Sequence, residues 1–132
     1  MAHYERLLEE LVEGVLRGPG ESAPALRAEV EAIAASWSGA ERVDGKSLPE
    51  PLAAYVEKVA RHAYRVTDED IAALKASGYG EDAIFELTVA AAVGAGRARV
   101  ERGLAVVDQV FAGKGEGGDS RSSNAAMRSN KR

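Results

Sequence analysis

The feature that most constrains the fold is a run of apolar and small residues in the second half of the chain. Between residues 81 and 93, apolar side chains occur on nearly every side of the helix that this segment would form. They are Ile84, Phe85, Leu87, Val89, Ala90, Ala91, Ala92 and Val93. We therefore expect a long central helix near residues 81–111, with its first half buried on all sides in a core or between subunits.

Two glycines interrupt this helix in its middle. Gly94 and Gly96 remove side chains where glycine costs about 1 kcal/mol relative to alanine. We therefore expect another segment to pack very close to the helix at this point. From Arg97 onward the pattern becomes amphipathic, with an apolar stripe formed by Val100, Leu104, Val107 and Phe111.

Four shorter helices are predicted before this one. Helical spacing of apolar residues marks the segments 3–17, 24–38, 49–66 and 68–77. Ser22 is the expected N-cap of the second helix. Thr67 and Asp70 have the spacing of a capping box, and Gly78 suits a left-handed helix end. With no strand-like alternation, the fold class is predicted to be all-α, with about five helices.

Charge divides the chain into an acidic body and a basic tail. Residues 114–132 contain five basic and two acidic residues, a net charge of +3. Because the net charge of the whole chain is −4, residues 1–113 carry a net charge of −7. The Gly, Ser and Asn content of the tail predicts disorder. We expect one helical domain over 1–113, with N-terminal helices in 1–47 and a core in 48–111. An acidic body argues against nucleic-acid binding as the main role.

The chain contains no cysteine, which excludes disulfides, thiol catalysis and zinc–thiolate sites. The charged start of the sequence is unlike a signal peptide. Its longest apolar run, residues 87–96, is about half of the roughly 18 residues that a membrane span needs. We therefore expect a cytoplasmic protein with no membrane association. The two histidines, His3 and His62, form no metal signature, so neither a metal nor a cofactor is predicted.

Residues 48–107 carry a resemblance to a known family. The segment TDEDIAALKASGYGEDAI, followed by a long helix rich in small residues, resembles the carboxymuconolactone decarboxylase family, which includes the alkylhydroperoxidase-D-like proteins. The resemblance implies a small all-helical protein that assembles as a trimer or hexamer.

The peroxidase members of that family carry a glutamate, a Cys-x-x-Cys and a histidine along the long helix. At the matching positions this chain has Asp82, then Gly94 and Arg97, then Glu101. Without a thiolate no peroxidatic nucleophile exists, so thiol peroxidase activity is not expected. The resemblance then implies an oligomeric structural or regulatory protein, which associates with itself or with a cysteine-bearing paralogue.

Arg97 suggests an alternative function, because it interrupts an apolar stripe. Its planar guanidinium would bind a small carboxylate or phosphate, with Gly94 and Gly96 leaving room for the ligand. Glu86 lies roughly 16 Å away along the helix and Glu101 one turn later, as further polar groups of such a site. This interpretation makes the protein a thiol-independent carboxylate-binding protein or lyase. The competing interpretation is that Arg97 forms a structural salt bridge at a helix or subunit interface.

Other polar residues are weaker candidates for chemistry. His62 could act as a general base, but it lies at the edge of its helix's apolar face and equally fits a hydrogen-bonded structural role. Tyr55, Tyr64 and Tyr79 could supply hydroxyl groups to a pocket, or lie at the core edge with a solvated tip.

Overall fold

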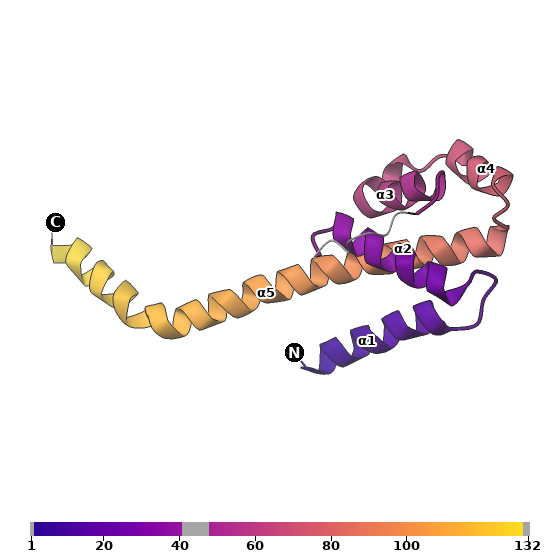
Figure 1. Ribbon diagram of the computed structural model, residues 1–132. Helices are drawn as coiled ribbons and strands as arrows, with labels where there is room; N and C mark the ends of the chain where they lie inside the picture. The colour runs from indigo at the N-terminus through magenta and orange to yellow at the C-terminus, as the bar shows by residue number, and fades with distance from the viewer. Residues whose placement is uncertain (1, 41–47, 131–132) are drawn as a thin grey trace. The chain divides into compact units, whose positions relative to one another are not determined.

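The computed structural model describes the backbone of residues 2–40 and 48–130, and the side chains of residues 3, 5–40 and 48–113. Within this part of the chain the protein is all-helical and contains no strand, which confirms the predicted fold class (Figure 1). Its five α-helices and one 3-10 turn are α1 (Ala2–Arg17), α2 (Pro24–Trp37), α3 (Leu52–His62), η1 (Ala63–Arg65), α4 (Asp68–Ala76) and α5 (Glu81–Asn130).

The chain divides into two compact units, residues 1–99 and 100–132. The first holds α1 to α4 and the part of α5 up to Arg99, so it ends earlier than the expected domain over 1–113. Helix α5 itself continues to Asn130 instead of ending near Phe111. No proline follows Phe111, so the backbone meets no residue that must stop a helix. The tail's charges lie outside the described side chains, and the predicted disorder of 114–132 remains a prediction.

The core of the first unit is formed mainly by α2, α3, α4 and the inner face of α5. Its largest fully buried side chains are Leu52, Leu74, Leu87, Val30 and Val56. Alanines at positions 90, 91, 95 and 98 of α5 let the neighbouring elements approach this helix closely. These residues follow the helical period on which the sequence prediction rested.

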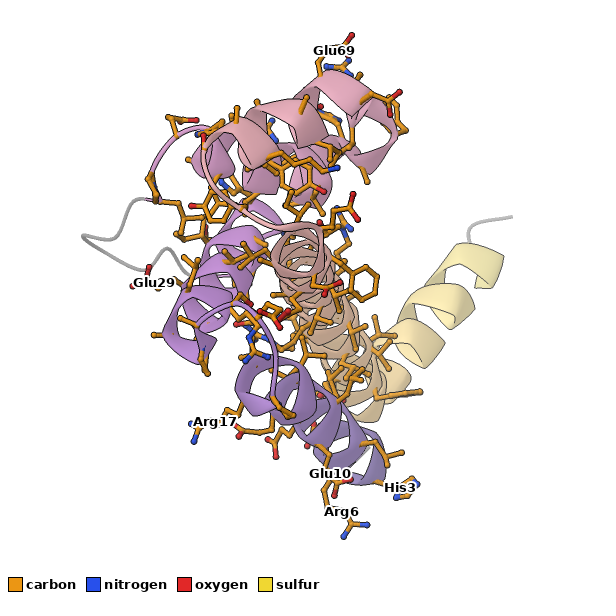
Figure 2. All side chains as sticks on the ribbon, turned by 90° about the vertical axis from the view of Figure 1, so that its right-hand side faces the viewer. His3, Arg6, Glu10, Arg17, Glu29 and Glu69 are labelled. Carbon is orange, nitrogen blue, oxygen red and sulfur yellow. The ribbon has the colours of Figure 1, made fainter. Side chains whose placement is uncertain are left out.

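Within the described residues up to Arg99, helix α5 is buried on one face only, so the core of the protomer does not cover it on all sides; burial between subunits, the other expectation, stays a prediction. Phe85 keeps 70% of its surface exposed, and Ala92 is also exposed. Figure 2 views the first part of α5 nearly end-on, with α1, α2 and the pair α3–α4 grouped around it. One side of this part of α5 is covered by no helix from the described residues up to Arg99.

One predicted helix cap and one predicted helix start are wrong. Helix α2 begins at Pro24 as predicted, but its N-cap is Ala23, whose methyl side chain cannot accept a capping bond. The predicted N-cap, Ser22, instead donates its hydroxyl to Glu86. Helix α3 begins at Leu52 instead of residue 49, since the residue before Pro51 is sterically kept out of the helical conformation. It ends at His62, and the next three residues form η1.

The capping interactions predicted at the two ends of α4 are confirmed. Thr67 and Asp70 form a capping box, in which the Thr67 backbone N–H donates to the Asp70 carboxylate at 2.8 Å. Gly78 follows the helix with φ +101°, a conformation that glycine adopts without a steric cost. This turn leads the chain from α4 into α5.

Candidate functional site

The position of the predicted ligand site is a close contact between α2 and α5. A Cβ atom added at Gly94 would overlap the backbone carbonyl of Glu31 on α2. The expected close packing at the glycines is therefore confirmed at Gly94. The α2 backbone fills the space beside Gly94 that was expected to admit a ligand, and ligand binding there stays a prediction. At Gly96 a Cβ would meet no atom within 4 Å.

Arg97 forms an ion pair with the same residue of α2. Its Nε donates to Glu31 Oε1 at 2.6 Å, with the Glu31 side chain 8% exposed and that of Arg97 25% exposed. This is the structural salt bridge that was one of the two interpretations of Arg97. The carboxylate of Glu31 thus takes the position that a ligand carboxylate would need. Ligand binding at Arg97 stays a prediction.

Glu86 lies in a different environment, against the loop between α1 and α2. Its carboxylate accepts bonds from the backbone N–H of Glu21 at 2.9 Å and of Ser22 at 3.2 Å, and from the Ser22 hydroxyl at 3.0 Å. These bonds, the Glu21 N–H first, lower the pKa of Glu86 below its usual value. A Cβ at Gly20 would overlap this carboxylate, so glycine there permits the contact. Glu86 therefore holds the loop that leads into α2.

Arg27 is a buried charge that the sequence analysis did not identify. Only 3% of its surface is exposed, and its guanidinium donates to the carbonyls of Val15 at 2.8 Å and Gly18 at 2.6 Å. Those carbonyls belong to the C-terminal end of α1, which lacks intrahelical donors for them. Arg27 and Glu31 stand one turn apart on α2, beside the apolar Val30 and Ala34. This pair of opposite charges within an apolar stripe is the sequence pattern that could have indicated two buried charges.

The remaining candidates are not gathered into one site. His62 is half-buried at the end of α3, and its ring contacts that of Tyr64 edge-on at 5.9 Å. Glu101 belongs to the second unit and is exposed. The Tyr55 hydroxyl lies 2.7 Å from that of Thr88. Glu86, Arg97 and His62 therefore have different neighbours, and the structure assembles no catalytic group from them.

A cavity of about 480 Å³ lies between the start of α2 and the turn before α5. The sequence did not predict it, although Tyr79, one candidate for a pocket hydroxyl, lines it. The other lining residues are Glu21, Ser22, Leu26, Gly78, Gly80, Glu81, Asp82 and Ala83. Its carboxylates lie near the N-terminal ends of helices, where negative charge is favourable. No group of three potential metal ligands occurs among the described residues.

None of the described helices combines the length and apolar character that crossing a membrane requires. No protein-family model matches the sequence, and neither the search of curated proteins nor that of solved structures returns a match.

Proposed function

We propose that the protein is a cysteine-less relative of the carboxymuconolactone decarboxylase and alkylhydroperoxidase-D-like family that acts as an oligomeric structural or regulatory protein. An alkylhydroperoxidase-D-like helical fold, assembly as a trimer or hexamer and a cytoplasmic location are parts of this proposal. The all-helical architecture supports it. The single observation that carries it is the contact of Gly94 and Arg97 with Glu31.

This contact supports the proposal because, by the resemblance, Gly94 and Arg97 correspond to the two cysteines of the family's dithiol. In a thiol peroxidase the two cysteines must be reachable by peroxide and by reductant. Here one of the two positions is pressed against the α2 backbone, and the other is an arginine held by a buried carboxylate. The residues at these positions stabilise the packing of α2 on α5 and offer no nucleophile.

Association through α5 accounts for the apolar surface that the protomer leaves exposed. Phe85 is 70% exposed on the first unit. On the second unit, Val106 and Val110 stand one helical turn apart and are both more than half exposed. Exposed apolar side chains that lie together on a helix are typical of a protein interface. The proposed partner is another copy of this chain or a cysteine-bearing paralogue.

The alternative, a carboxylate-binding protein or lyase, requires a ligand to displace Glu31 from Arg97. Displacement would leave a nearly buried carboxylate without its partner, which carries a large free-energy cost. The contacts of Arg97 therefore favour the structural function.

The proposal is tested by two assays on the purified wild-type chain. The first measures peroxide turnover with a dithiol reductant, and we expect no activity above the protein-free reaction. The second measures mass by sedimentation equilibrium, and we expect concentration-dependent oligomers. Peroxide turnover that survives metal chelation and repurification would contradict the proposal. So would a monomer that neither self-associates nor binds a cysteine-bearing paralogue in a pairwise titration.

A further inference from the structure

The side of α5 that faces away from the core carries a regular series of residues, which we call the outer seam. Its members are Asp82, Phe85, Val89, Ala92, Gly96 and Arg99. They are spaced alternately three and four residues apart, so they line one face of the helix. All six are exposed or half-buried, whereas Ile84, Leu87, Ala91, Gly94 and Ala98 on the opposite face are buried.

The outer seam has the pattern by which one helix recognises another. Alternating spacings of three and four residues are the heptad repeat of a coiled coil, and the seam covers about 26 Å of helix. Its four central residues are uncharged, and its ends carry opposite charges, Asp82 and Arg99. The inner face of α5 is already used by the core, so the outer seam is a second and separate packing surface.

We propose that the outer seam binds the outer seam of a second copy of this chain, with the two α5 helices antiparallel. Phe85 then packs over Gly96 of the second copy, Val89 packs against Ala92, and Asp82 pairs with Arg99. This inference rests on the proposed function, because it names the surface and the geometry of self-association.

The seam is complementary to itself only in the antiparallel direction. A two-fold axis between positions 90 and 91 brings each member opposite another member of the seam, with large residues facing small ones. In the parallel direction, Asp82 would face Asp82 and Arg99 would face Arg99 in the second copy. Two Phe85 rings would also compete for one position, while two Gly96 residues left a gap. Size and charge therefore select the same orientation.

Contacts within the protomer leave the seam residues available. Phe85 is 70% exposed, and Gly96 has open space where a side chain would lie. Asp82 makes no ion pair with any described side chain. Arg99 is exposed and donates one bond from Nη2 to the Ala60 carbonyl at 2.7 Å, so its other N–H groups remain free to bind a carboxylate.

A two-fold contact limits the assemblies that the protein can form. It is isologous, with every contact made twice, and it produces a dimer or a larger even-numbered assembly, such as a hexamer built from three such dimers. A simple trimer contains no two-fold contact. The inference therefore predicts an even number of subunits.

Sedimentation equilibrium of Phe85→Ala tests the seam directly. Each interface loses two equivalent aromatic contacts, and at about tenfold for each contact the dissociation constant should rise about 100-fold. The matched control is Tyr64→Ala, which removes an aromatic residue that is 79% exposed but lies outside α5. Tyr64→Ala should associate like the wild type. Equal association of Phe85→Ala and the wild type would overturn the inference, and so would a trimeric wild type.

A charge swap tests the pairing without relying on apolar contacts. Asp82→Arg and Arg99→Asp each place like charges together and should weaken association. The double variant restores opposite charges in the antiparallel geometry, so its association should return toward that of the wild type. Circular dichroism checks that each variant is folded. A folded double variant that associates no better than the single variants would contradict the pairing of Asp82 with Arg99.

The relative direction of the two α5 helices is tested by cysteine cross-linking. No other thiol competes in this experiment, because the chain has no cysteine of its own. Val89→Cys and Ala92→Cys proteins are prepared separately, then mixed and oxidised mildly. The mixture should give a disulfide-linked dimer, while either protein alone should give little. Efficient cross-linking of Val89→Cys with itself would indicate parallel helices and overturn the inference. A wild type that stays monomeric defeats self-association as a whole, whereas oligomers insensitive to all these variants defeat only the outer seam.

Discussion

Gly94→Ala should destabilise the protein although it improves the helix propensity of α5. Alanine in a helix interior is favoured over glycine by about 1 kcal/mol. At position 94, however, the new Cβ overlaps the backbone of Glu31, which cannot move aside as a flexible side chain would. Overpacking of this kind costs about 1–3 kcal/mol, and moving α2 also strains the ion pair of Glu31 with Arg97. Set against the gain of about 1 kcal/mol in helix propensity, these costs leave an expected net loss of up to about 2 kcal/mol in the free energy of unfolding.

The assay is urea unfolding followed by circular dichroism, with Gly14→Ala as the matched control. Gly14 lies inside α1, and a Cβ there meets no atom within 4 Å. Gly14→Ala should therefore raise the free energy of unfolding by about 0.5–1 kcal/mol. If Gly94→Ala proved as stable as Gly14→Ala, the close contact between α2 and α5 would be refuted, and the proposed function would lose the contact that supports it.

Three further predictions concern the polar contacts. Glu86→Gln should melt at a lower temperature than the wild type at neutral pH, because the N–H groups of the loop stabilise the Glu86 carboxylate. This difference in melting temperature should vanish as the pH falls through the pKa of Glu86, which lies below 4.5, because the carboxylate is then protonated. Melting curves recorded across acidic pH check this. Arg97→Ala should lower the free energy of unfolding by up to about 3 kcal/mol, because it leaves the Glu31 carboxylate without its ion-pair partner. A double-mutant cycle with Glu31→Ala should give a coupling energy of about 0.5–3 kcal/mol. Additive effects of the two substitutions would show that the ion pair contributes nothing to stability. Thr67→Ala should cost about 1 kcal/mol through loss of the capping box, and no loss in chemical unfolding would exclude that role.

The helices were predictable because their apolar residues recur at helical spacing. The fully buried Val30, Val56 and Leu87 belong to apolar patterns that can be recognised in the sequence alone. Helix ends were less predictable, because more than one neighbouring residue was suitable as the cap of a helix. Ser22 is a suitable N-cap by residue type, yet its hydroxyl bonds to Glu86, which is 64 residues away in the chain. No pattern of neighbouring residues reports such a contact.

The candidate site was predictable only in part. The sequence marked Gly94 and Gly96 alike, but only Gly94 faces α2, and the direction in which a residue faces depends on tertiary packing. The charged Arg27 and Glu31 were missed because a search for an apolar stripe passes over charges within it. Both are buried, and they hold α1 and Arg97 respectively. Buried charges of this kind become visible only once their partners are known.

The most direct test of the central claim, that Glu31 and the α2 backbone fill the space around Gly94 and Arg97, is a thermal-shift screen of the wild type against small carboxylates and phosphates. Arg97→Ala serves as the reference variant, and circular dichroism confirms that it is folded. A true ligand at 100 times its dissociation constant adds about 2.7 kcal/mol, which is several degrees for a domain of this size. The account predicts no stabilisation of the wild type, because Glu31 already occupies Arg97. A carboxylate that raises the melting temperature of the wild type, but not that of folded Arg97→Ala, would contradict it.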